Sequence, residues 1–269
     1  MLAFTAMLAC NKSVADRTAN LAALNPANED LNAGTWKLIL LSRPDTFAVA
    51  APAAKTSPAY LADLNEIKAD QANLSSDQLS QIKYWSAGGV LRWNEIMRDL
   101  VAKYNLPPYQ NSDTSYPIPS STNPFSYPDF PFSNPPYSAR AYAYVSAAQY
   151  DALVACWHYK TLYNRGAPYT ADSTIKALAG KNSLPSYPSE GAVLAGVTAE
   201  LMQLLFPDEI ANIQQKLAEQ ELSLIASGAA ARERAAAHQG CGARLRLPDR
   251  RHVALHHQGD RLAHRVRLL

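Results

Sequence analysis

The sequence predicts an all-α fold, a bundle of roughly six helices. Apolar residues recur at helical spacing in successive long segments, and no two segments show the alternating pattern of paired strands. The chain has 269 residues, of which 48% are hydrophobic and 18% charged, so it is long enough to bury a core of its own. We expect one helical domain over residues 30–228, preceded by an N-terminal segment (1–29) and followed by a tail (229–269).

The N-terminal segment has the features of an exported lipoprotein. Cys10 follows the apolar stretch MLAFTAMLA and precedes Asn-Lys, which resembles the lipidated cysteine at the end of a bacterial lipoprotein signal. The usual basic residues are missing, so either the start codon is misplaced or this is an ordinary apolar N-terminus. We expect export to the cell envelope with a membrane anchor at Cys10, and a cytoplasmic protein is the alternative.

The first helices are expected after a polar tether (11–35) and a short apolar run (36–41), whose type, strand or extended, the pattern leaves open. A capping box, with Ser75 as N-cap and Gln78 reaching back, predicts the start of one helix. Gly88 and Gly89 interrupt the pattern before a further helix over residues 91–104. The apolar positions of the first helical segment are Tyr60, Leu61, Leu64 and Ile67.

A loop rich in proline and aromatic residues is expected over residues 107–136. It holds nine of the eighteen prolines, which excludes a continuous helix. We interpret it as an extended loop whose rings pack on the helices, and a polyproline ligand for a partner protein is the alternative.

Three more helices complete the predicted bundle. The longest covers residues 137–164, and its many alanines indicate close approach by neighbouring helices. The next covers residues 189–206 with one apolar face. The last is expected to begin at Pro207 with two acidic residues in its first turn, and to run to about Ser227, with Gly228 as the glycine that follows its end.

The tail differs in composition from the rest of the chain. Residues 230–269 carry nine arginines against three acidic residues, and five of the six histidines. His252 and His256 have helical spacing, but no further ligand is spaced to complete a metal site, and no aromatic residue is present for base stacking. We therefore expect no metal site and no nucleic-acid partner. Our hypothesis is that a reading-frame slip near residue 230 produced this composition, with a truncated or non-native C-terminus.

The start of the helix at residue 189 is a candidate anion site. Ser189 is placed to cap the helix, Pro188 fixes the approach of the chain, and Gly191 would let a ligand come close to the backbone. The structural alternative is an ordinary capped helix.

Two cations at the end of the preceding long helix strengthen this hypothesis. Lys160 and Arg165 precede a Pro/Gly-containing connector that leads to Ser189. A lysine and an arginine facing a helix N-terminus form an arrangement that binds tetrahedral oxyanions. The alternative is that both cations cap the C-terminal end of their own helix.

The residues around these positions resemble a known superfamily. The stretches HYKTLYNRGAPY and LPSYPSEGAVLAG, within residues 30–228, are similar to the type 2 phosphatidic acid phosphatase and vanadium-dependent haloperoxidase superfamily, in particular its bacterial haloperoxidase-like branch. The resemblance implies a helical bundle that binds phosphate, or vanadate as cofactor, and acts on a small-molecule substrate.

The match to the superfamily motifs is incomplete. Lys160 and Pro168 match the first motif, while Ala167 takes the place of its arginine, leaving Arg165 as a displaced substitute. Pro188 and Ser189 match the second motif, Pro-Ser-Gly-His. There, Glu190 replaces the glycine and Gly191 replaces the histidine.

These departures remove the groups that would move protons. The resemblance implies that histidines attack phosphorus, protonate the leaving group or ligate vanadate, and glycine can do none of these. Glu190 is a weak candidate for a substitute acid, although its charge would repel a bound oxyanion. We therefore expect an oxyanion cradle formed by Lys160, Arg165, Ser189 and Gly191, with impaired phosphatase or haloperoxidase activity. A non-enzymatic cell-envelope lipoprotein that binds a partner through its helices and its Pro/aromatic loop is the alternative.

Overall fold

The computed structural model describes residues 21–25, 29–104, 113 and 135–231. All regular secondary structure over these residues is helical, which confirms the predicted all-α class. Six helices of 11 to 29 residues form the body of the fold. They are α1 (Pro58–Ala72), α2 (Ser76–Ser86), α3 (Gly89–Tyr104), α4 (Pro135–Tyr163), α6 (Glu190–Leu205) and α7 (Ile210–Ala226). Three single turns, η1 (Ala33–Thr35), α5 (Pro168–Ala171) and η3 (Pro207–Glu209), connect or precede them.

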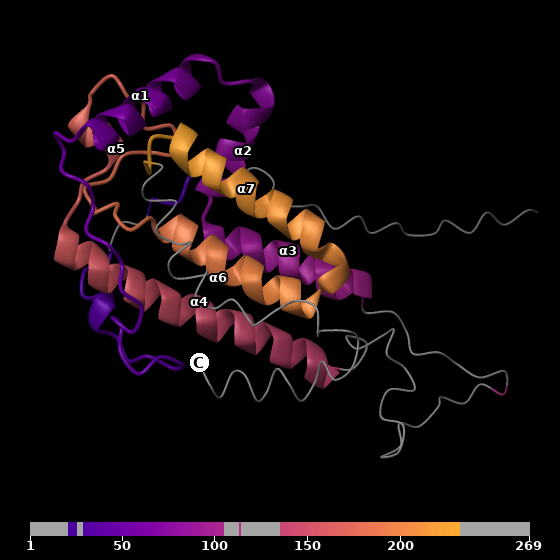
Figure 1. Cartoon of the computed structure of the whole chain (residues 1–269). Coiled ribbons are helices and arrows are strands. Elements are labelled where there is room, and N and C mark those ends of the chain that lie inside the picture. Colours follow the sequence, from indigo (N-terminus) through magenta and orange to yellow (C-terminus); the bar gives the residue numbers. More distant parts are fainter. Residues whose placement is uncertain (1–20, 26–28, 105–112, 114–134, 232–269) are drawn as a thin grey trace, which may run out of the picture.

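Helix α6 lies at the centre of the bundle. It packs against α4 along one side and against α3 and α7 along others (Figure 1). Nine of its sixteen residues are buried, among them Ala195, Ala199 and Met202. Small residues dominate its first half, so the neighbouring helices approach its backbone closely. The N-terminus of α6 is therefore placed between the end of α4 and the side of α7.

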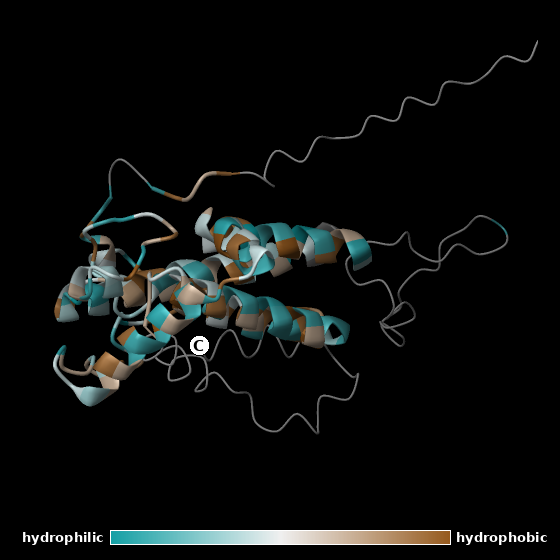
Figure 2. Ribbon diagram, turned by 90° about the horizontal axis from the view of Figure 1, so that it is seen from above, coloured by the Kyte–Doolittle hydropathy of each residue, from teal (hydrophilic) through white to brown (hydrophobic). Residues whose placement is uncertain are grey.

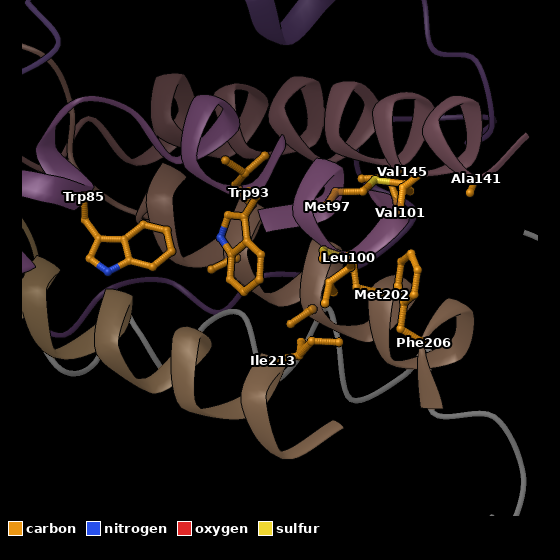
Figure 3. Packing of buried hydrophobic residues seen from close by; sticks show 13 residues of the cluster. Trp85, Trp93, Met97, Leu100, Val101, Ala141, Val145, Met202, Phe206 and Ile213 are labelled. Carbon is orange, nitrogen blue, oxygen red and sulfur yellow. The ribbon is translucent and has the colours of Figure 1, made fainter. Parts of the chain in front are cut away.

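The main hydrophobic core fills the space between α3, α4, α6 and α7. Trp93, Met97 and Leu100 of α3 belong to one cluster with Met202 of α6, Phe206 just after this helix and Ile213 of α7 (Figure 3). Hydrophobic and hydrophilic residues alternate along the helices (Figure 2), as expected for helices that bury one side. A second cluster, which includes Tyr60, Ile67 and Ile225, joins α1 to the end of α7.

The helix starts follow the local signals in the sequence. The capping box is confirmed: Ser75 Oγ accepts a hydrogen bond from Gln78 N at 3.2 Å, and Ser75 N donates to Gln78 Oε1 at 2.9 Å. At the start of α1, Ser57 Oγ accepts a hydrogen bond from Tyr60 N at 3.2 Å, and a proline follows at the first helical position. Gly228 adopts a φ of +76°, as expected for a glycine that follows a helix end.

Some of the predicted boundaries differ from the structure. Pro207 does not open α7 but forms the separate turn η3, because α6 ends at Leu205 and the chain must change direction before Ile210. Pro135 and Pro136 belong to the first turn of α4, where proline needs no hydrogen-bond partner, and the rest of the expected loop lies outside the described residues except residue 113. The turn α5 was not predicted. Ala230 and Ala231, assigned to the tail, are buried.

Residues 36–53, which we call the N-terminal strap, run along α4 without forming a strand. Backbone amides of the strap donate to the carboxylate of Asp151, and its carbonyls accept hydrogen bonds from tyrosines. The amides are those of Ile39, Leu40 and Leu41, and the pairs are Tyr150 with Lys37, Tyr159 with Phe47, Tyr163 with Val49 and Tyr187 with Ala50. The short apolar run at 36–41 is therefore not a strand but an irregular segment with bends, and its Trp36 and Ile39 side chains are exposed.

A carboxylate between α1 and the connector gives a prediction for acid stability. Asp172 accepts hydrogen bonds from the Thr174 hydroxyl at 2.6 Å and from Lys68 Nζ at 3.0 Å, and these groups lower its pKa from 3.8 to about 2. Because the folded state holds the ionised form, its stabilising contribution is complete above pH about 4 and is lost as the pH falls toward 2. We expect an NMR titration of Asp172 to show a midpoint near 2. A midpoint near 3.8 would contradict this contact.

Candidate functional site

The start of α6 is capped by the residue that the sequence indicated. Ser189 is 5% exposed, and its hydroxyl accepts a hydrogen bond from Ala192 N at 3.4 Å. The preceding carbonyl, of Pro188, lies 3.7 Å from the thiol of Cys156 on α4. The N–H groups of Glu190 and Gly191 occupy the first helical turn, where a helix offers donors without acceptors of its own. The helix start therefore combines a buried hydroxyl with the backbone N–H groups of a first helical turn.

Lys160, near the end of α4, reaches this helix start. Its ammonium lies 2.5 Å from a carboxylate oxygen of Glu190, the first residue of α6. The lysine side chain is only 5% exposed, whereas that of Glu190 is 41% exposed. The Trp157 ring lies beneath the ammonium, 4.4 Å from its centroid, and adds a cation–π contact. The structure thus places a buried cation at the positive end of a helix and pairs it with a carboxylate.

The pairing decides what the site presents to solvent. A positive ammonium and a helix N-terminus both attract an anion, and here a side chain of the protein provides one. The Glu190 carboxylate is therefore the anion that pairs with the Lys160 ammonium at this helix start. Sequence reasoning named both residues but did not predict that they would contact each other.

Arg165 makes its contacts elsewhere. Its Nη2 donates to the carbonyl of Ala53 in the strap, and its guanidinium lies 4.8 Å from the centre of the Tyr60 ring. Its Nη1 is buried and has no hydrogen-bond partner in the part of the chain that the structure describes. The Arg165 carbonyl accepts a hydrogen bond from the backbone N–H of Ser186, in the connector before Ser189, at 2.7 Å. Its participation in an oxyanion cradle stays a prediction.

Gly191 faces α7. A Cβ added at this position would lie 2.9 Å from Leu224 Cδ2, and the Gly191 carbonyl accepts a hydrogen bond from Gln220 Nε2 at 3.3 Å. The close packing of α6 on α7 is therefore one reason for a glycine here. The sequence analysis gave close approach of a ligand as its reason and missed α7, because nothing local in the sequence indicates which helix will lie opposite.

Trp157 was not singled out from the sequence. It precedes Lys160 by three residues on the same helix, a spacing that places two side chains on one face. An aromatic residue three positions before a lysine was thus the available signal. Tyr187 was also missed. It is buried immediately before Pro188 and connects the site to the strap through the carbonyl of Ala50.

Other predicted features lie outside what is described. Cys10, His252, His256 and the rest of residues 232–269 belong to the part of the chain whose placement is not described. Within the described ranges, no group of three or more His, Cys, Asp or Glu residues is arranged to hold a metal ion. None of the helices described is both long and apolar enough to cross a membrane.

No family model matches the chain, and no curated protein matches it. The relation to the haloperoxidase and phosphatase superfamily therefore remains a proposal based on the motifs quoted above.

Proposed function

We propose that this protein binds a tetrahedral oxyanion, phosphate or vanadate, at the start of α6, and that it derives from the haloperoxidase and phosphatase superfamily. One observation carries the proposal: the buried Lys160 ammonium pairs with the carboxylate of Glu190, the first residue of α6, which follows the Ser189 cap. A buried cation is costly unless an anion accompanies it, and a helix N-terminus adds donors for the same anion. Lys160 would neutralise the oxyanion, while Ser189 and the Gly191 N–H would donate to its oxygens.

We expect little or no catalysis by this form of the chain. Hydrolysis of a phosphomonoester needs a nucleophile and a proton donor, and peroxide-dependent halide oxidation needs groups that hold and protonate the vanadate-bound oxidant. His158 is the one histidine in the described residues, and its ring packs on Tyr159. The carboxylate of Glu190 forms an ion pair with the Lys160 ammonium. Turnover of p-nitrophenyl phosphate, or bromide oxidation after vanadate addition, well above a no-protein blank would contradict this expectation.

A calorimetric titration tests binding separately from catalysis. Wild-type protein is expected to bind orthovanadate or phosphate saturably. Lys160→Met, which keeps the apolar stem but removes the charge, is expected to weaken binding by more than about tenfold, since a charge-assisted contact to an oxyanion is lost. Lys216→Met removes a lysine paired with Glu219 on α7 and is the matched control. Equal affinity in the Lys160 and Lys216 variants would sink the proposal.

A second function is favoured by one specific feature. The Lys160 ammonium already has a partner within the protein, so the pair also fits a purely structural role. In that case the chain is a non-enzymatic cell-envelope lipoprotein, anchored to the membrane through Cys10, that binds a partner through its helices and its Pro/aromatic loop. This candidate predicts no saturable vanadate or phosphate binding by the wild type.

A further inference from the structure

We infer that Glu190 regulates the proposed oxyanion site by competing with the ligand. This inference rests on the proposed function and adds a mechanism to it. The carboxylate of Glu190 pairs with the ammonium of Lys160 in the ligand-free protein. An oxyanion must displace this carboxylate in order to bind. The Glu190 side chain therefore blocks the Lys160 ammonium. Only an anion that interacts with Lys160 more strongly than a single carboxylate does is expected to bind.

The geometry of the pair makes the carboxylate a substitute ligand. Glu190 is the first residue of α6, so its own backbone belongs to the helix end that attracts anions. Among the described residues, Glu190 Oε2 is the one atom that accepts a hydrogen bond from the Lys160 ammonium. An ammonium has three N–H donors. The buried ammonium therefore has donor capacity that a ligand with several oxygens would use.

The two partners differ in their freedom to move. The Lys160 side chain is 5% exposed and is held over the Trp157 ring, so it stays at the helix start. The Glu190 side chain is 41% exposed and lies at a helix end, so it can rotate into water without opening the core. Release of Glu190 alone would leave the buried ammonium without an anion, so the carboxylate is expected to leave only when an entering anion takes its place.

The charge of an entering anion decides how well it competes with Glu190 for the Lys160 ammonium. A monoanionic carboxylate displacing another carboxylate gains no charge. A dianionic tetrahedral oxyanion gains one, which favours phosphate or vanadate over acetate or halide as the displacing ligand.

The test is a titration of Glu190→Gln with orthovanadate, beside the wild type. The variant keeps the size of the side chain and removes its charge, and we expect its affinity for orthovanadate to rise by about tenfold. Glu200→Gln, a glutamate replacement on the same helix outside the site, is the matched control and is expected to leave the affinity unchanged. Glu190→Ala is a second variant with the same expected direction, should the glutamine variant fail to fold by circular dichroism.

The outcomes separate this inference from the proposed function. Saturable binding that is equally strong in wild type and both Glu190 variants would overturn competition by Glu190 and leave the oxyanion site standing. No saturable binding by any form would overturn both. Saturable binding by the wild type that becomes about tenfold tighter in both Glu190 variants, and is lost when Lys160→Met is added, would support both.

Discussion

Replacing Asp151 by alanine is expected to destabilise the protein by about 3 kcal/mol, because one buried carboxylate holds three backbone amides of the strap. Asp151 is 2% exposed, and its two oxygens accept from Ile39 N at 2.8 Å, Leu40 N at 2.6 Å and Leu41 N at 2.7 Å. Hydrogen bonds to a charged acceptor contribute more than neutral ones. Their joint loss would release the first part of the strap from α4.

Urea unfolding of the Asp151→Ala variant measures this effect. Asp99→Ala is the control, since Asp99 is an exposed aspartate on α3 and its replacement is expected to change the free energy of unfolding by less than about 0.5 kcal/mol. If the two variants unfold at the same urea concentration, the strap contributes far less to stability than its hydrogen bonds indicate.

Gly34→Ala is expected to cost about 2–3 kcal/mol, because the turn η1 lies directly against the backbone of α4. A Cβ at Gly34 would lie 2.5 Å from His158 N and 2.7 Å from His158 Cα. Backbone atoms of a long helix cannot rotate away as a side-chain end can. The turn, and with it the start of the strap, would have to move off α4.

Gly180→Ala separates this close contact from ordinary glycine effects. Gly180 has a φ of +96° and no atom within 4 Å of the added Cβ, so its replacement is expected to cost only the backbone strain of about 1 kcal/mol. Thermal unfolding of both variants gives the comparison. A Gly34 variant as stable as the Gly180 variant would show that η1 does not pack on α4 this closely.

The helices could be predicted because their signals are local. The Ser75 capping box, the glycine after α7 and the helical spacing of apolar residues each act within a few residues of the element they define. The strap could not be predicted in the same way. Its carbonyls and amides are bound by side chains roughly 110 to 140 positions away, and backbone groups leave no trace in the sequence pattern.

Part of the candidate site could also be predicted from the sequence, because its signals are local. A serine before an apolar helix predicts a cap, and a lysine near a helix end is expected to seek negative charge. The partner that Lys160 finds, Glu190, depends on how α4 crosses α6, which is a property of the packed core. Arg165 was assigned to the same cradle, but its guanidinium contacts the strap carbonyl of Ala53, a segment that sequence reasoning left without a position.

The central claim is that Lys160 and the start of α6 form an oxyanion site. A crystal structure of the Glu190→Gln variant grown with orthovanadate tests it most directly. The claim predicts a vanadate within hydrogen-bond distance of the Lys160 ammonium, with oxygens facing the Ser189 hydroxyl and the first N–H groups of α6. A Lys160 side chain turned away from the helix start, or vanadate bound only at other places on the molecule, would contradict it.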